Sequence, residues 1–172
     1  DLLFLARYDT IPNHTKETVN LSSILNNLVQ LYQQQAMAKQ IHLKSQLNEK
    51  LYLLGDPNQI TRLFTNLIQN AIHYTPSKGT VEIIANRSAS HVVVNVKDTG
   101  VGIAPKDLEN IFERFWRADK SRSYNSGGSG LGLAIAQAIA ENHGGLITAT
   151  SQLGIGSCFT VRLPVSSLNE CF

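Results

Sequence analysis

The residues of this chain whose types and spacing could support chemistry are a pair of asparagines, one aspartate and a group of glycines. Asn66 and Asn70 are one helical turn apart, so on a helix their side chains share a face. An amide carbonyl is an uncharged oxygen ligand, which suits a Mg²⁺ ion that takes its other ligands from water and substrate phosphates. Two asparagines that face solvent are the alternative interpretation of this pair.

Asp98 ends the apolar run 91–97 and is followed by Gly100 and Gly102. A β-branched run of this kind predicts a buried strand that delivers a carboxylate to the rim of a pocket. The glycines let the backbone turn sharply and let a flat ligand approach closely. A carboxylate only accepts hydrogen bonds, so it would select the exocyclic amine of adenine over the carbonyl of guanine. An aspartate that only stabilises a turn is the alternative.

Gly128, Gly130 and Gly132 separate a polar stretch, residues 120–128, from an apolar segment predicted to be a helix over 129–140. The polar stretch is rich in Ser, Asn and Gly, which predicts a mobile loop. Glycines at a helix N-terminus leave the backbone amides unobstructed, and such amides form an anion site. The chain has no Gly-Lys-Ser/Thr sequence and no strand directly before these glycines, which excludes a P-loop and a dinucleotide-binding turn. A glycine-rich linker before a core helix is the alternative.

The elements that would position these residues alternate between helices and strands, which predicts a two-layer α/β sandwich. Asp56 as N-cap and Pro57 as first residue begin the helix of the asparagine pair, which ends at the turn 75–79. An apolar stripe predicts an earlier helix, capped by Asn20 or Ser22. Strands are predicted at 41–47, 51–54, 80–85, 91–97, 146–150 and 157–163, and a short helix at 104–111.

The 172-residue length fits one domain, and 42% hydrophobic with 16% charged residues describe a globular chain rather than a disordered or membrane-spanning one. The net charge of +2, with no basic stripe along a helix, gives no reason to expect nucleic acid as a partner. Cys158 and Cys171 form neither a metal pair nor a disulfide framework. The densest basic cluster, at 114–122, is either a solvated surface or an anion-binding group.

Taken in order, these motifs closely resemble those of one protein family. Four stretches of the chain resemble the N, G1, F and G2 boxes of sensor histidine kinases, in the same order. They are residues 66–70, 98–102, 112–115 and 128–133. These boxes mark the catalytic and ATP-binding domain of the GHKL superfamily of ATPases and kinases. The glycines at 144–145 and 154–156 match later glycine positions of the family, so the resemblance runs from about residue 20 to 164.

The resemblance implies a Bergerat-type ATP-binding fold, in which three helices cover one face of a mixed β-sheet. It implies ATP and Mg²⁺ as ligands, with Asn70 as the Mg²⁺ ligand and Asn66 lining the same site. His73 and either Arg114 or Arg117 would face the phosphates. The other residues implied in nucleotide binding are Tyr74, Asp98, Gly100, Gly102, Ile103, Gly128, Gly130, Leu131 and Gly132, with Phe112 and Phe115 as the anchors of an ATP lid over 117–128.

The resemblance also implies how the chain is divided into segments and which partners it binds. Residues 1–12 would be the end of a dimerisation-domain helix, 13–19 a linker and first strand, 20–164 the catalytic domain and 165–172 a tail. The partners would be the protein's own dimerisation and histidine-phosphotransfer domain and the receiver domain of a response regulator, with no nucleic acid. The parent protein would be a homodimer with its kinase portion in the cytoplasm.

The residue types favour phosphoryl transfer over hydrolysis. ATPases of the superfamily need a carboxylate base one turn before the metal-binding asparagine, and here that position is Asn66, which cannot act as a base. The expected function is therefore transfer of the ATP γ-phosphate to a histidine of a dimerisation domain. The family's acceptor sequence follows none of the five histidines of this chain, which are His14, His42, His73, His91 and His143.

We therefore expect the chain to bind ATP without phosphorylating itself. An anti-sigma-type Ser/Thr protein kinase of the same superfamily is one alternative, which the dimerisation-like residues at 1–8 argue against. A degenerate nucleotide-sensing module is the other. Many family members carry Lys where this chain has His73, and a neutral imidazole neutralises phosphate charge less well than an ammonium does.

Overall fold

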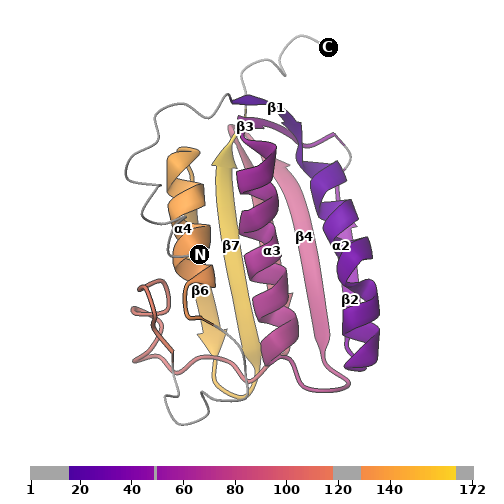
Figure 1. Cartoon of the computed structure of the whole chain (residues 1–172), viewed down its shortest axis with the longest axis vertical. Coiled ribbons are helices and arrows are strands. Elements are labelled where there is room, and N and C mark those ends of the chain that lie inside the picture. Colours follow the sequence, from indigo (N-terminus) through magenta and orange to yellow (C-terminus); the bar gives the residue numbers. More distant parts are fainter. Residues whose placement is uncertain (1–15, 49, 118–128, 166–172) are drawn as a thin grey trace.

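A computed structural model describes residues 16–48, 50–117 and 129–165 of the chain. In these residues three helices lie on one face of a five-stranded mixed sheet, so the architecture is a two-layer α/β sandwich (Figure 1). This arrangement confirms the predicted fold class. The predicted dimerisation-helix end at 1–12 and the predicted mobile loop at 120–128, with Gly128, lie outside the described residues.

The first two helices begin at side chains that cap them. Asn20 caps α2 (Leu21–Ala38), and its Oδ1 accepts a hydrogen bond from a first-turn N–H at 3.0 Å. Asp56 caps α3 (Pro57–Tyr74), and its Oδ1 accepts from two first-turn N–H groups at 2.8 and 3.2 Å. Each such cap contributes about 1 kcal/mol to helix stability. By contrast, α4 (Gly132–Asn142) begins without a side-chain cap.

The large sheet is mixed, and its central strands are antiparallel. Strand β2 runs parallel to β4, whereas every other neighbouring pair in this sheet is antiparallel. The β4–β5 hairpin turns at Ala89 and Ser90, which extends the first of these strands past its predicted end. The strand order is β2 (His42–Leu47), β4 (Thr80–Ser88), β5 (His91–Asp98), β7 (Gly156–Pro164) and β6 (Leu146–Gln152).

The two short strands predicted near residues 41–54 are both present, but they belong to different sheets. Strand β2 joins the large sheet, whereas β3 (Tyr52–Gly55) pairs with β1 (Glu17–Asn20) in a separate antiparallel pair. This small pair lies at one end of the helical layer and delivers the chain directly into α3 (Figure 1). Proximity in sequence therefore did not determine which strands pair.

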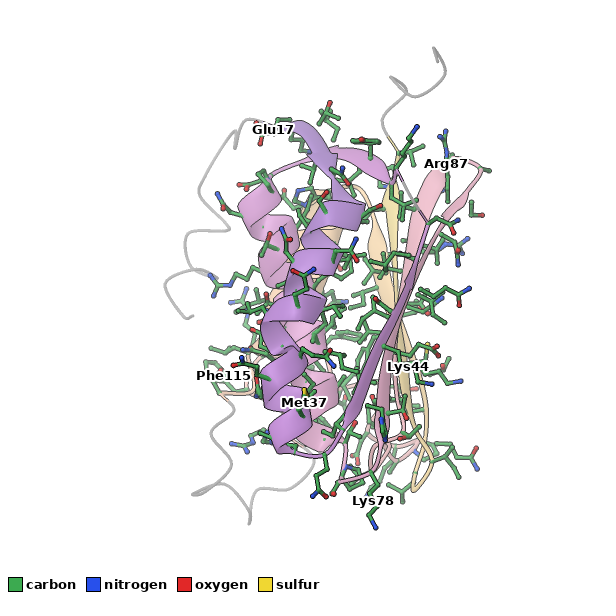
Figure 2. The ribbon with its side chains drawn as sticks, turned by 90° about the vertical axis from the view of Figure 1, so that its right-hand side faces the viewer. Glu17, Met37, Lys44, Lys78, Arg87 and Phe115 are labelled. Atoms are coloured by element: carbon green, nitrogen blue, oxygen red, sulfur yellow. The ribbon has the colours of Figure 1, made fainter. Side chains whose placement is uncertain are left out.

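The core fills the space between the helices and one face of the sheet. Alternate residues of the central strands point into it, such as Val94 and Val96 of β5 and Phe159 of β7, each at most 1% exposed. The facing side of α3 contributes Phe64, which has no exposed surface, and burial of such a side chain contributes roughly 1.5–3 kcal/mol. Intervening strand residues such as Lys44 point away from the helices (Figure 2). No helix in the described ranges is long and apolar enough to span a lipid bilayer.

Two predicted helical stretches differ in the structure. Residues 104–111, predicted as a short helix, form successive turns, because the N–H groups of Asp107, Asn110 and Glu113 each bond to the carbonyl three residues earlier. This pattern lacks the continuous i to i−4 bonds of an α-helix. The helix predicted over 129–140 begins instead at Gly132, because Gly130 adopts a positive φ of 68° that a helix does not allow.

Candidate functional site

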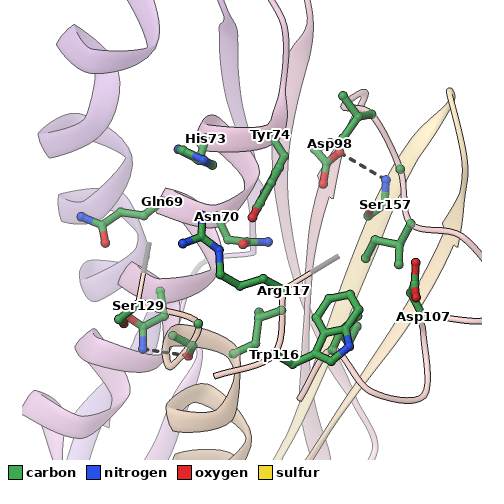
Figure 3. Close-up of a pocket in the computed structure, with 18 of the residues that line it drawn as sticks. Gln69, Asn70, His73, Tyr74, Asp98, Asp107, Trp116, Arg117, Ser129 and Ser157 are labelled. Carbon is green, nitrogen blue, oxygen red and sulfur yellow. Dashed lines mark hydrogen bonds between the residues drawn. The ribbon is translucent and has the colours of Figure 1, made fainter. Parts of the chain in front are cut away.

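A cavity of about 770 Å³ opens between α3, the start of α4 and the turn that follows β5. It is the place where the three motifs predicted from the sequence come together. Figure 3 shows side chains from α3, from β5 and from the 104–117 segment around this one space. The predicted residues that line it are Asn66, Asn70, His73, Tyr74, Asp98, Gly102, Ile103, Arg117, Gly130 and Gly132.

Asp98 is buried at the end of β5, with 6% of its surface exposed. Its Oδ1 accepts hydrogen bonds from the backbone N–H of Gly100 at 2.8 Å and from that of Ser157 at 3.2 Å, and Figure 3 shows the bond to Ser157. Among the described residues no hydrogen bond ends on Oδ2, and the residue lines the cavity. The carboxylate is thus held by one oxygen and presents the other as an acceptor for a ligand.

Two opposing effects act on the pKa of Asp98. Burial raises it, because the charged form loses hydration, and the two backbone hydrogen bonds from Gly100 and Ser157 lower it. Burial is the larger effect, so the pKa lies above the ordinary value of 3.8. A donor from a bound ligand would restore part of the lost hydration, so a ligand with an amine group would stabilise the ionised carboxylate.

The two glycines after Asp98 are required by protein packing as well as by any ligand. A Cβ on Gly100 would lie 2.7 Å from both Asp98 Oδ1 and the carbonyl oxygen of Tyr74. Gly102 has a φ of 70°, and a Cβ there would lie 2.1 Å from the carbonyl oxygen of Gln152. A sharp turn and close approach of a ligand were the predicted reasons for both glycines, and in the structure their close neighbours are Asp98 Oδ1 and backbone atoms of α3 and β6. Gly100 does not line the cavity.

The last turn of α3 carries Asn70, His73 and Tyr74 to the cavity. The rings of His73 and Tyr74 meet edge to face with centroids 4.7 Å apart. Lys39, at the end of α2, donates from Nζ to the carbonyl oxygens of Ile72 at 2.8 Å and His73 at 3.1 Å. An ammonium at this position stabilises the negative end of the helix dipole and fixes the end of α3 against α2.

The ring of His73 has a lowered pKa for three reasons. Partial burial is the largest, and the positive charges of Lys39 and Arg117 follow. In Figure 3 the side chain of Arg117 extends toward Asn70, on the opposite side of the cavity from Asp98. The residue that replaces the family's lysine is therefore neutral at physiological pH, and two neighbouring cations supply the positive charge of this region.

The start of α4 is held against α3 by a side chain. Asn66 donates from Nδ2 to the carbonyl oxygen of Gly132 at 3.0 Å. No side chain caps the first turn of α4, so its backbone amides have no protein partner within the helix. This is the arrangement expected of an anion site at a helix N-terminus. Leu131 caps α4 through its backbone and is 2% exposed, and it does not line the cavity.

The predicted lid anchors behave differently from one another. Phe112 packs on the core and meets Phe159 edge to face with centroids 6.4 Å apart. Phe115 is 55% exposed with a φ of 64°, and it is attached through its backbone, whose N–H donates to the Gly130 carbonyl at 3.0 Å. The prediction of a hydrophobic anchor was wrong for Phe115, and Trp116 packs on the core instead.

Of the two arginines predicted to face phosphates, Arg117 lines the cavity and Arg114 is exposed outside it. Several lining residues were missed by the motif search, because they lie outside the boxes or between the box positions that the resemblance singled out. Lys39 was accessible in principle as a basic residue at the end of an amphipathic helix. Ser157 contributes through its backbone, for which no sequence signal exists. The missed polar and aromatic residues are Gln35, Lys39, Gln69, Asp107, Trp116, Ser129 and Ser157, and the missed aliphatic ones are Val101, Ala104, Ile111, Leu133, Ile135 and Leu153.

Comparison with known proteins matches the sequence of this chain to one family. A family model described as histidine kinase-, DNA gyrase B- and HSP90-like ATPase matches residues 55–167. The chain is 42% identical over 172 residues to the sensor histidine kinase RppB of Synechocystis, covering 98% of this chain and 37% of RppB. It is 35% identical over 176 residues to the sensor histidine kinase WalK of Bacillus subtilis, covering 99% of this chain and 28% of WalK. The chain therefore spans well under half the length of these relatives.

Solved structures of histidine kinases share the fold. Full-length ShkA in complex with AMPPNP superposes with a TM-score of 0.83 at 28% identity, covering 95% of this chain and 34% of ShkA. The nucleotide-free catalytic domain of ThkA superposes with a TM-score of 0.78 at 27% identity, covering 88% of this chain and 96% of that domain. ThkA in complex with the response regulator protein TrrA gives 0.79 at 24% identity, covering 98% of this chain and 47% of that one, a likeness of fold alone.

Proposed function

This chain belongs to the family of histidine kinase-, DNA gyrase B- and HSP90-like ATPases, and on that premise we propose that it is the ATP-binding catalytic domain of a sensor histidine kinase. The single observation that carries the proposal is the convergence of Asp98, Asn70 and the glycines at 130–132 around one cavity. Kinship with RppB and WalK supports it, since both are sensor histidine kinases.

In this proposal Asp98 recognises the adenine base of ATP. Its Oδ2 accepts a hydrogen bond from the exocyclic amine of adenine, while Oδ1 stays bonded to the backbone N–H groups of Gly100 and Ser157. Guanine would present a carbonyl oxygen to the same carboxylate, and two acceptors facing each other in a buried site disfavour binding. Gly102 and Ile103 line the space beside Asp98, and Tyr74 faces it from α3.

The opposite end of the cavity would hold the phosphates and a metal ion. The first-turn amides of α4, near Gly130 and Gly132, provide donors, and Arg117 provides positive charge. Asn70 offers one amide oxygen, which is a suitable ligand atom for Mg²⁺. The described residues contain no group of three or more His, Cys, Asp or Glu that could hold a metal, so phosphates and water would complete the coordination. Bound Mg²⁺ would neutralise charge on the phosphates as one of them is transferred.

The side chains favour transfer to an external acceptor rather than hydrolysis. Asn66 has no basic atom with which to activate water, and its amide nitrogen is already bonded to Gly132. The role of this chain is then to hold the terminal phosphate in position for an imidazole of another domain. We propose that a dimerisation domain carries this imidazole, that the parent protein is a homodimer, and that a receiver domain of a response regulator accepts the phosphate afterwards.

The test is a phosphorylation assay with ATP labelled at the γ-phosphate. The chain is incubated with Mg²⁺, alone and together with the dimerisation domain of a sensor histidine kinase, which is supplied as a separate polypeptide. We expect the label on the dimerisation domain and none on the isolated chain. The label should be lost in acid, because phosphohistidine is acid-labile and phosphoserine is not.

Two controls make the assay decisive. A dimerisation domain whose acceptor histidine is replaced by glutamine should remain unlabelled, and so should the native domain mixed with the Asp98→Asn chain. Label on the isolated chain would contradict the proposed separation of acceptor and catalytic domain. An acid-stable label would favour a Ser/Thr kinase, and no ATP binding by the native chain would favour a degenerate module.

A further inference from the structure

We propose that Asn66 is a positioning residue that fixes the start of α4, and with it the backbone amides that receive the phosphates, rather than a ligand of the metal ion. The inference rests on the proposed ATP site and assigns a specific task to one residue in it. It starts from the hydrogen bond that joins Asn66 Nδ2 to the Gly132 carbonyl oxygen at 3.0 Å.

The chemistry of this contact settles which end of the amide is involved. A backbone carbonyl only accepts hydrogen bonds, so the side-chain atom that approaches it must be the NH₂ group of Asn66. The amide oxygen is therefore turned away from Gly132. Asn70, one turn further along α3, has no such partner among the described residues, so its amide is free to rotate toward a ligand.

The bond, together with the helical conformation that begins at Gly132, holds the orientation of a peptide group. A trans peptide is planar, so its N–H points opposite to its carbonyl, and a fixed Gly132 carbonyl also fixes the N–H of Leu133. That N–H belongs to the first turn of α4 and has no acceptor within the helix. Asn66 thus orients one of the free amides at the anion-binding end of the helix.

A second bond holds the neighbouring peptide in the same way. The carbonyl of Gly130 accepts from the backbone N–H of Phe115 at 3.0 Å, and the positive φ of Gly130 makes the turn possible. The next N–H, that of Leu131, is oriented by this bond. The turn is therefore held from two sides, by a backbone donor of the 104–117 segment and by the Asn66 side chain from α3.

This assignment makes a distinctive prediction for a carboxylate at position 66. In Asn66→Asp the donor becomes an acceptor, which places two oxygens in contact at Gly132 and should disturb the turn more than truncation to alanine does. A residue that ligated the metal directly or through water would behave in the opposite way, because a carboxylate is a stronger Mg²⁺ ligand than an amide. The two roles therefore predict opposite orders of ATP affinity for Asn66→Ala and Asn66→Asp.

The first experiment is calorimetric titration of the native chain, Asn66→Ala and Asn66→Asp with ATP and Mg²⁺, and separately with adenosine. We expect ATP affinity to fall roughly threefold to tenfold in Asn66→Ala, the effect of one hydrogen bond, and further in Asn66→Asp. Adenosine affinity should stay within twofold of the native chain. Gln69→Glu is the matched charge control, since it brings a carboxylate to the same cavity from the same helix.

The second experiment needs no ligand. Amide hydrogen exchange of Phe115 and Ile135, whose N–H groups donate to the carbonyls of Gly130 and Leu131, is compared among the same chains. We expect faster exchange in both Asn66 variants but not in Gln69→Glu. ATP affinity of Asn66→Asp equal to or above that of Asn66→Ala would overturn the assignment, as would unchanged exchange at Phe115 and Ile135. Failure of the native chain to bind ATP would instead refute the proposed function, while the exchange measurement would still test the role of Asn66.

Discussion

The two ends of the cavity are built by different means. At the Asp98 end, made of Asp98, Gly100, Gly102 and Ser157, the contacts that fix the geometry involve backbone groups of strands and turns. At the helix end, made of Asn66, Asn70, His73 and Gly132, the contacts are side chains that reach from one helix to another. One end is thus part of the sheet, and the other is assembled from three separate helices.

This difference suits the proposed reaction. The base does not change during phosphoryl transfer, so the Asp98 end can be rigid, and breaking its contacts requires disruption of β5 and β7. The phosphates change their charge and position during transfer, so the helix end must let individual contacts exchange while the core stays intact. Side-chain hydrogen bonds can open one at a time, which backbone ladders do not.

The largest effect should come from Asp98→Asn. The new amide keeps its oxygen on the N–H groups of Gly100 and Ser157 and turns its NH₂ toward the adenine amine, so two donors face each other. We expect ATP affinity, measured by calorimetry, to fall at least ~100-fold.

The same variant also tests the pKa of Asp98. A pKa raised by burial means that this group stabilises the fold most at pH below 3.8, and that the contribution is lost as the pH rises through the folded-state value. The asparagine chain, which cannot ionise, should therefore be at least as stable as the native chain at neutral pH in urea unfolding. Native ATP affinity should fall as acid protonates Asp98. A variant that is clearly less stable at neutral pH would contradict this.

The next largest effect should be a difference in stability between alanine substitutions at two glycines. Gly102 belongs to the Asp98 end of the cavity and Gly132 to the helix end. Gly102→Ala places a Cβ 2.1 Å from the Gln152 carbonyl oxygen at a φ of 70°, so we expect a loss of roughly 2–4 kcal/mol in the free energy of unfolding. At Gly132 the nearest atom to an added Cβ is 3.8 Å away, so alanine there should be neutral or stabilise by up to ~1 kcal/mol. Equal losses in urea unfolding would contradict the comparison.

A smaller effect is expected from Lys39→Met. The change removes the ammonium that bonds to the last carbonyls of α3, and water can replace part of those bonds because the site is partly exposed. We expect the free energy of unfolding to fall by about 1 kcal/mol. Lys44→Met is the matched control, because Lys44 lies exposed on the other side of the sheet. A loss of the same size in both variants would argue against a specific role for Lys39.

The smallest effect should come from His73. Its lowered pKa means that the neutral ring stabilises the fold above pH 6.5, the ordinary value, and that this contribution is lost as the pH falls through the lower folded-state value. Protonation also adds positive charge near the phosphates, so native ATP affinity should rise by up to roughly threefold between pH 7.5 and 6.0 relative to His73→Ala. Parallel pH profiles of the two chains would show that His73 makes no such contribution.

Features that depend on a few neighbouring residues followed from the sequence. The Asp56 cap with Pro57 behind it, the end of α3 before the turn 75–79 and the strand that delivers Asp98 were all predicted at their observed places. Each depends on interactions within one turn or one strand, which composition and spacing report directly. The resemblance of the motifs also predicted ten of the 23 residues that line the cavity.

Features that depend on distant partners did not follow from the sequence. The segment 104–111 became turns rather than a helix, and β2 paired with β4 rather than with its neighbour β3. Phe115 has an aromatic side chain but is held by its backbone, because the chain around it must reach Gly130. In each case the competing local structure was possible, and packing against another element determined the outcome.

Asn66 illustrates the difference between features that depend on neighbouring residues and features that depend on distant partners. Residue type and helix period are enough to place a polar residue without a basic atom one turn before Asn70. The contact of its NH₂ group with the Gly132 carbonyl, 66 positions away in the chain, arises only when α3 and α4 pack together. A side chain's type fixes what it can donate or accept, whereas its partner depends on which helices the core packs side by side.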